Sequence, residues 1–587
     1  MDLYEYTLLS SFDITKRKHH EVKVYLRDNV LYPVLQRDEH GYILCFAKPK
    51  RMQNNKLSYL GWLFDSHNEV HRTLLWRLFR ASIHHLSSHM VTSDFEAYAN
   101  WSKDKDLDLA TFAVSIVEDA VVRAHLKSFF PSHILDNAIA NAISYLAMKP
   151  LHAISNGTLC VMAAILSNFS TGLSKGKLDE NTEKEVNDSV SALKRIENTV
   201  QKELLDKAKM QKEENSQDFK DLVFDERVKT AEYIYEILED YGETSEVPSL
   251  PYTESHGRNL IFHRNPIPPE EEIELVLKKT LEVFDFQALQ QEDAHNELHG
   301  NSIQAEVSQV FSSWEAKEAL QMKIVEEYRV LGKGTHFNSF GFPEEDYTEF
   351  VRRQIVLGST VRRILEKLRL FRNVGGEDYR QEVGLLDMQE AIQVIASKSP
   401  RTDVFVRDEL QTQDEQWTIL IDASHSLSFF TGEVQGIALC MAEVARKLMV
   451  NPNSWSMYAF NTGFYIIKDF LEPYSNHTRA RIGGLKHTGM TYLPDGLTLA
   501  AAALKRKMAE LKILVAVSDF FPSGYGEVEK ALAETARKIE KSGIGVIGIG
   551  INSNAVKKYF RTHCVVENPY DLMKKFIKAF YEYSSAV

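Results

Sequence analysis

Hydrophobic and polar residues change their spacing along the chain, and these changes divide it into segments. Over residues 70–172 the apolar side chains recur at helical spacing, as in HRTLLWRLFRASIHHLSSHM and DLATFAVSIVEDAVVRAHLKSFF. Two earlier stretches, EVKVYLRD and GYILCFAKPK, alternate like strands, with the turn sequence DEHG between them. We therefore predict a mostly α-helical N-terminal domain over residues 1–172.

The middle of the chain has three segments of different character. Residues 173–244 are rich in charged helix formers, which favours an exposed helix or a helical hairpin. Residues 245–272 hold five of the chain's 16 prolines, so we expect a linker or a long ordered loop. Helical spacing resumes over residues 273–405, a helical connecting region in which His295 and His299 are expected on an exposed helix.

The last part of the chain has a different pattern, in which short β-branched runs alternate with helical stretches. The runs are WTILID, SWSMYAF, KILVAVSD and GIGVIGIGI, and helices are expected over 432–449, 495–510, 526–541 and 570–582. Nearly continuous apolar strands separated by helices are typical of a parallel sheet covered on both faces. We predict a doubly wound, mainly parallel α/β domain over residues 406–587, preceded by a large, mostly α-helical region.

The composition of the chain excludes several classes of protein. Hydrophobic residues make up 44% and charged residues 26% of the 587 positions, which is ordinary for a globular protein. The net charge of -13 argues against nucleic-acid binding, because phosphates need a basic surface. The four cysteines form no CxxC, so neither a disulfide framework nor a thiolate zinc site is expected. The N-terminus lacks a signal-peptide pattern and the stretch TLCVMAAILSNF is too short to span a bilayer, so we expect a cytoplasmic protein.

Three segments at predicted strand ends carry oxygen ligands. The run WTILID ends at Asp422, and Ser424 and Ser426 follow at alternate positions. Thr491 lies in HTGMTYLPDGL, and Asp519 ends KILVAVSD. Ligand sites in open α/β sheets lie beyond the carboxyl ends of the strands. Two carboxylates and three hydroxyls suit Mg²⁺ or another divalent cation, with one coordination position open to a carboxylate from a partner.

This set of residues resembles the metal-ion-dependent adhesion site of von Willebrand factor A domains, whose motif D-x-S-x-S is followed by a threonine and a second aspartate. The layout around it, with EVGLLDMQEAIQVIASKSPRTDVFVRDE upstream, is similar to the nitric-oxide-reductase activation protein D family and to the T subunit of aerobic cobalt chelatase. Two departures stand out. Family members often have Thr-Asp-Gly where this chain has Ser518-Asp519-Phe520, and the acidic tract of the chelatase subunit is absent.

The resemblance implies a partner and a role. Such proteins act with a MoxR-type AAA+ ATPase, and the A domain connects that motor to a client, often a metalloenzyme that needs cofactor insertion or activation. We therefore expect a non-catalytic adaptor or co-chaperone. The segment VLGKGTHF does not complete a phosphate-binding loop, which fits a motor supplied by the partner. An alternative implied by the same resemblance is a subunit of a cobalt or magnesium chelatase that acts on a tetrapyrrole.

Other chemical interpretations of the Asp422 segment are weaker. Asp422, Ser424 and His425 lie on one short loop, whereas the members of a hydrolase triad converge from separate positions, and G-x-S-x-G is missing. The sequence SDFFPSG is similar to the phosphorylated loop of a receiver domain, but a receiver also needs an acidic pair after its first strand, and only Asp422 is present.

The helical domain offers a second candidate metal site. His85 and His89 are four residues apart on one predicted helical face, and Glu118 and Asp119 follow on another helix. Two histidines with a downstream glutamate match the ligand spacing of H-E-x-x-H zinc peptidases, which makes His85, His89 and Glu118 the candidate Zn²⁺ ligands. Leu86 occupies the position of the general base, so a degenerate peptidase domain is the expected form of this alternative.

Overall fold

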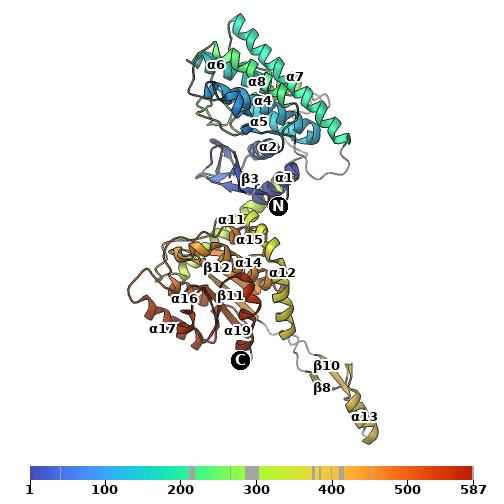
Figure 1. Ribbon diagram of the computed structural model, residues 1–587, viewed down its shortest axis with the longest axis vertical. Helices are drawn as coiled ribbons and strands as arrows, with labels where there is room; N and C mark the ends of the chain where they lie inside the picture. Colours follow the sequence, from blue (N-terminus) through green and yellow to red (C-terminus); the bar gives the residue numbers. More distant parts are fainter. Residues whose placement is uncertain are drawn as a thin grey trace. The chain divides into compact units, whose positions relative to one another are not determined.

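The chain folds into two compact units, Met1–Lys317 and Glu318–Val587, in the computed structural model (Figure 1). The structure describes residues 1–584 except 29, 40, 211–218, 265, 284–302, 373–376, 383–384, 398–399, 409–414 and 450. His295 and His299 lie outside the described residues, and with them the exposed helix predicted there.

The first unit begins with one helix and two small sheets. They consist of α1 (Leu3–Thr15), β1 (Val22–Arg27), β2 (Val34–Asp38), β3 (Gly41–Ala47), β4 (Lys50–Arg51), β5 (Lys56–Tyr59) and β6 (Trp62–Asp65). The two predicted strands are present as β1 and β3, but they pair in parallel, and the DEHG turn instead connects the antiparallel pair β2 and β3. Strand β2 was not predicted, because the polar residues of this strand hide its alternation of apolar and polar positions.

Helices make up most of the first unit, as predicted. They are α2 (Glu69–Thr92), α3 (Ala99–Ser102), α4 (Leu107–Phe129), α5 (Ile134–Ala147), α6 (Gly157–Thr171), α7 (Glu180–Met210), α8 (Phe224–Glu239) and α9 (Glu270–Val283). Side-chain oxygens of Asn68, Asp106 and Asn156 accept hydrogen bonds from the first turns of α2, α4 and α6, which fixes where these helices start. The division between the units falls within α11 (Gln304–Leu331).

Two middle segments pack more closely than the sequence suggested. Helix α7 buries an apolar stripe that includes Leu193, Ile196 and Leu204, so this charged helix is amphipathic and packs against α4. The proline-rich segment 245–272 is an ordered loop that belongs to the first unit, because Val247, Leu250 and Tyr252 are buried. Of the two predicted possibilities for this segment, the ordered loop is the one observed.

A seven-stranded sheet forms the centre of the second unit, with strand order β16-β15-β14-β11-β12-β13-β7. Every neighbouring pair is parallel except β12 and β13. The strands are β7 (Phe340–Gly341), β11 (Glu415–Asp422), β12 (Trp455–Phe460), β13 (Phe464–Lys468), β14 (Leu511–Ser518), β15 (Gly545–Ile551) and β16 (Thr562–Val566). The mainly parallel sheet is therefore confirmed, and β7, β13 and β16 were not predicted.

Helices cover both faces of this sheet (Figure 1). Ile419 and Ile421 of β11 face one core with α12 and α14, whereas Leu420 faces the other core with α11 and α16. This alternation explains why the strand reads as a continuous apolar run. The helices of the second unit are α12 (Tyr347–Arg372), α13 (Met388–Ser397), α14 (Thr431–Leu448), α15 (Asn476–Gly483), α16 (Leu493–Lys505), α17 (Val528–Lys541), α18 (Val556–Tyr559) and α19 (Lys575–Ser584).

The second unit also extends further toward the N-terminus than residue 406. Helix α12 packs against α14 and α15, and β7 joins the sheet beside β13, so residues predicted as a connecting region form part of the α/β core. Between α12 and β11 lies a small antiparallel sheet of β8 (Glu377–Gln381), β9 (Leu385–Leu386) and β10 (Phe405–Asp408), together with α13. No described helix of the chain is long and apolar enough to cross a membrane.

Candidate metal centre

The candidate site lies where the order of the strands reverses. From β11 the chain passes through α14 to β12 on one side, and it later returns to β14 on the other side of β11. The loops that follow β11 and β14 therefore flank the position at the carboxyl edge where open α/β sheets have their ligand crevice. Asp422 is the last residue of β11, and Asp519 directly follows Ser518, the last residue of β14.

Two hydrogen bonds fix the carboxylate of Asp422, which is fully buried. Its Oδ1 accepts a bond from the backbone N–H of Ser424 at 2.9 Å, and its Oδ2 accepts one from the hydroxyl of Ser518 at 2.5 Å. The Ser518 hydroxyl also accepts a bond from the N–H of Phe520 at 3.0 Å, which ties the β14 loop to the β11 loop. The sequence did not single out Ser518 as a contact of Asp422, because that contact spans 96 positions of the chain.

The two predicted serine ligands lie together. Ser424 Oγ is 3.0 Å from Ser426 Oγ, and Ser424 is buried whereas Ser426 is exposed. The intervening His425 has an exposed side chain, and its backbone N–H donates to the carbonyl of Gly489 at 3.0 Å. The structure therefore presents two hydroxyl oxygens at the end of β11 and directs the histidine to solvent.

Backbone bonds attach the Thr491 loop to both aspartate-bearing loops. Thr488 N–H donates to the carbonyl of Ala423 at 2.9 Å, while Thr491 exchanges two 3.1 Å bonds with Ser523 in the loop after β14. Gly489 has φ of 73°, and a Cβ there would lie 2.8 Å from Thr462 Oγ1, so this turn needs glycine. The loop therefore holds Thr491, which is buried, next to the crevice.

The turn after Asp519 accommodates a phenylalanine at the position where the proteins it resembles in sequence often have glycine. Phe520 has φ of 59°, in the left-handed region that costs a side-chain-bearing residue about 1–2 kcal/mol. Glycine has no side chain and adopts this left-handed conformation without that cost. Phe520 buries its ring and packs edge-on against Phe560, with the ring centroids 5.4 Å apart, and this packing offsets the backbone strain.

Electrostatics give the site its character. Burial, followed by the charge of Asp519, raises the pKa of Asp422 to about 7. Within the described part of the chain, no lysine, arginine or histidine forms an ion pair with Asp422 or Asp519. Asp422 and Asp519 interact electrostatically without an ion-paired cationic side chain among the described residues, and the hydroxyls of Ser424 and Ser518 contact Asp422. Such a set of oxygen atoms suits a hard divalent cation such as Mg²⁺.

In the first unit, two of the three predicted zinc ligands lie together, and the third lies elsewhere. Nε2 of His85 and Nε2 of His89 each lie 3.2 Å from Oδ1 of Asp119. Glu118 instead accepts a 2.6 Å bond from Tyr98 and pairs with Arg227 at 3.3 Å. Adjacent helical residues point about 100° apart, so only one of them faces the histidines. Asp119 therefore takes the place predicted for Glu118.

The proline-rich loop adds residues to this region that the sequence did not suggest. Tyr252, Glu254 and His256 are largely buried within the first unit, and Tyr252 packs edge-on to His85. Burial, followed by the charge of Asp119, raises the pKa of Glu254 to about 8. The only sequence signal was the clustering of polar side chains in YTESH, which a linker would equally show.

Comparisons with known proteins add little. A scan against protein-family models and a search of curated proteins found no match. Among solved structures, the chain is similar to the PilB minor pilin from Streptococcus sanguinis and to a point mutant of that pilin, at 17% and 15% identity and a TM-score of 0.24 each. The alignments cover 31% of this chain and 63% and 64% of the pilin chains, less than two thirds of their length. We therefore base the function on the residues of the site.

Proposed function

We propose that the second unit is a von Willebrand factor A domain that binds a carboxylate of a partner through a magnesium site, and that the protein is a non-catalytic adaptor. The observation that carries this proposal is the junction of the Asp422 and Asp519 loops, where two carboxylates lie without a cationic partner among the described residues. Asp422 and Asp519 would hold the ion, with the hydroxyls of Ser424, Ser426 and Thr491 as neutral ligands. Bound Mg²⁺ supplies the missing positive charge and an open coordination position.

Exposed apolar side chains on the same loops support a protein partner. Phe429 is 93% exposed at the end of the 3₁₀ turn after Ser424, Phe521 is 63% exposed after β14, and Met490 is 50% exposed in the Thr491 loop. Large exposed apolar residues near one polar site are typical of interaction surfaces. We infer that the partner presents an acidic side chain flanked by apolar residues.

The partner class follows from the family resemblance. We propose a MoxR-type AAA+ ATPase as the motor and a client protein, for example a metalloenzyme that needs activation or cofactor insertion. Both would be met in the cytoplasm, and all four cysteines are free, which fits a reducing compartment. The net charge of -13 supports a protein partner over nucleic acid.

The test is co-purification of the full-length chain with a MoxR-type ATPase from the same organism. We expect the complex to be lost when Ser424→Ala and Ser426→Ala are combined, and also when wild-type protein is treated with EDTA. Ser428→Ala is the matched control, since Ser428 lies on the same 3₁₀ turn outside the ligand set. Circular dichroism checks the fold of each variant. Retention of the ATPase by the double variant in EDTA would show that no metal bridge connects the proteins.

A further inference from the structure

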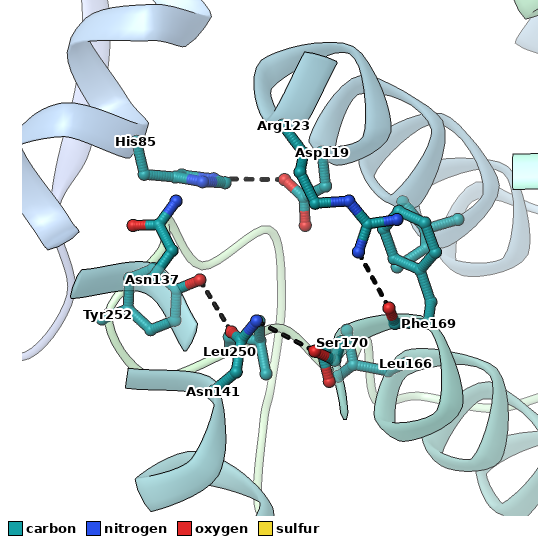
Figure 2. A pocket seen from close by; sticks show the side chains of 11 residues that line it. His85, Asp119, Arg123, Asn137, Asn141, Leu166, Phe169, Ser170, Leu250 and Tyr252 are labelled. Atoms are coloured by element: carbon teal, nitrogen blue, oxygen red, sulfur yellow. Dashed lines mark hydrogen bonds and ion pairs between the residues drawn. The ribbon is translucent and has the colours of Figure 1, made fainter. Parts of the chain in front are cut away.

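Three ligand atoms in the first unit form a compact triangle. Nε2 of His85 and Nε2 of His89 are 2.9 Å apart, and each lies 3.2 Å from Oδ1 of Asp119. The histidines are one helical turn apart on α2, and Asp119 reaches them from α4 (Figure 2 shows His85 facing Asp119). The three groups therefore converge from two packed helices, which is the usual way in which helical bundles build metal sites.

The size of this triangle fits a metal ion. Ligand atoms held at about 2.0–2.1 Å from one ion lie about 3.4 Å apart in a tetrahedral site and about 3.0 Å apart on one face of an octahedron. The observed edges of 2.9, 3.2 and 3.2 Å lie close to these values.

The surroundings prepare the histidines as ligands. His89 Nδ1 lies 2.9 Å from Ser93 Oγ. In the tautomer that carries its proton on Nδ1, His89 donates to that hydroxyl, and its Nε2 lone pair is free to bind an ion at the triangle. A neutral imidazole with its second nitrogen held by an outer partner is the common form of a metal-binding histidine.

A small cavity of about 30 Å³ adjoins the triangle. Its lining includes His85, Asp119, Arg123, Asn137, Asn141 and Tyr252 (Figure 2). Asn137 is buried, and its Oδ1 has no hydrogen-bond partner among the described residues. The volume is enough for about two water molecules, since one needs roughly 10–15 Å³.

The cationic side chain at this cavity is held by partners outside the triangle. The guanidinium of Arg123 bonds to Glu197 and to the carbonyl of Phe169, and Glu197 is also paired with Lys127 at 2.7 Å. The carboxylate in contact with the two histidines is that of Asp119, and its negative charge favours a cation there.

A second cluster, which shares only helix α2 with the first, provides an internal contrast. His84, His133 and Asp136 also bring their ligand atoms close together. Arg77 and Arg80 each lie 3.0 Å from the Asp136 carboxylate, so two guanidinium groups already supply its counter-charge and would repel a metal ion. Ligand types alone do not separate the two clusters, whereas the nearby charges do.

We propose that His85, His89 and Asp119 bind one divalent transition-metal ion of the Zn²⁺ or Fe²⁺ class, with its remaining coordination positions directed toward the cavity. Two imidazoles and one carboxylate suit both ions, and the remaining ligands would be water or molecules of similar size. A peptide segment does not fit a space of about 30 Å³, and Leu86 is fully buried where a zinc peptidase has its base, so the site is not proposed to cleave peptides.

The test begins with the full-length chain, stripped with chelator and dialysed against Zn²⁺, Fe²⁺ under anaerobic conditions, or Mg²⁺. We expect one equivalent of Zn²⁺ or Fe²⁺ per chain by elemental analysis, and the arm with the higher affinity identifies the ion. Replacement by Co²⁺ should give the visible absorption of a nitrogen–oxygen site. Wild-type protein that retains no stoichiometric transition metal and gives no Co²⁺ spectrum would overturn the proposal.

Variants then assign the ligands. His85→Gln and Asp119→Asn should each weaken transition-metal binding by at least 100-fold, whereas His84→Gln, in the neighbouring cluster, should leave it unchanged. Circular dichroism excludes unfolding as the cause, and the two ligand variants on different helices guard against one of them failing to fold. Equal metal content in His85→Gln, Asp119→Asn and wild type would overturn the assignment. Because Asp422 lies in the other unit, this result is independent of the proposed magnesium site.

Discussion

Asp136 in the first unit and Asp422 in the second are both completely buried aspartates, but their neighbours differ in charge. Burial opposes the ionisation of Asp136, yet a hydrogen bond from His133 and the charges of Arg80 and Arg77 outweigh it and lower its pKa to about 2. For Asp422, burial and then the charge of Asp519 raise the pKa to about 7, because its bonding partners among the described residues are hydroxyl and amide donors without a positive charge. The first aspartate is compensated within the protein, whereas the second becomes fully compensated only by a proton or a bound cation.

This difference separates a structural acid from a candidate ligand. A buried carboxylate that already has its counter-charge contributes to stability, and it is costly to remove because its partners stay buried. A buried carboxylate that has no counter-charge attracts a cation from solution and contributes to its binding energy. The same distinction divides Asp119 from Asp136 within the first unit. Four measurements test this distinction.

Neutralising Asp136 should cause the largest loss of stability. Asp136→Asn leaves Arg77 and Arg80 facing a neutral amide, and breaking a buried ion pair in this way costs about 3–5 kcal/mol. Hydrogen exchange of α2 and α5 in increasing urea measures the loss where it occurs. Asp104→Asn, at an exposed position, is the control. A loss below about 1 kcal/mol would mean that the two arginines do not depend on Asp136.

Neutralising Asp422 should not lower the stability of its unit, in contrast to Asp136, but should weaken Mg²⁺ binding. Asp422→Asn removes a poorly compensated charge, so the free energy of unfolding of the second unit should stay the same or increase by on the order of 1 kcal/mol. Affinity for Mg²⁺ should fall by at least tenfold, because a charged ligand is lost. Isothermal titration calorimetry and urea unfolding measure the two quantities. Loss of stability together with unchanged Mg²⁺ binding would reverse the roles assigned to the two aspartates.

The pH dependence of Mg²⁺ binding should reflect Asp422. Its pKa is raised above the unfolded value of 3.8, so the metal-free folded state binds more protons than the unfolded state between about pH 4 and 7. Metal-free stability from this group therefore falls as pH rises through that window. Mg²⁺ must displace the proton below pH 7, so its affinity should rise up to tenfold per pH unit to pH 7 and then level off. The rise in Tm on adding Mg²⁺, measured from pH 5.5 to 8, checks this, and Asp422→Asn should lack the dependence.

Removing the hydroxyl of Ser518 should have the smallest of these effects. Ser518→Ala deletes the bond to Asp422 Oδ2 and leaves the Phe520 N–H without its acceptor. We expect about 1 kcal/mol lower stability and about tenfold weaker Mg²⁺ binding, because an outer partner orients the ligand. Ser523→Ala, which alters the Thr491 loop instead, is the comparison variant. No change in Mg²⁺ affinity would show that Asp422 is oriented without Ser518.

The sequence correctly placed Asp422 and Asp519 at strand ends because that signal is local. An apolar run that ends in an acid places that acid at a strand end, and strand–helix alternation places the strand ends on one edge. It could not predict the Ser518 contact with Asp422, since which two strands are neighbours depends on the whole sheet. It also missed β7 and β13, a two-residue edge strand and the antiparallel partner of β12.

The error at Glu118 has a similar cause. The spacing of His85 and His89 fixes their common face on one helix, but the rotation of α4 about its own axis is set by tertiary packing. Arg227, 109 positions away, pairs with Glu118 and thereby leaves Asp119 for the histidines. The segment that contributes Tyr252 was ambiguous, because its prolines are equally frequent in linkers and in packed loops.

The strand order has a consequence for the order of events during synthesis. Central strand β11 is made well before its neighbour β14, and Ser518 and Asp519 leave the ribosome almost 100 residues after Asp422. Until then, one of the two charged ligands of the proposed coordination shell does not exist, and a nascent chain would hold the ion with Asp422 as its sole carboxylate. Magnesium uptake would therefore report that the chain has been made through β14, and a chain truncated before Asp519 would lack this uptake.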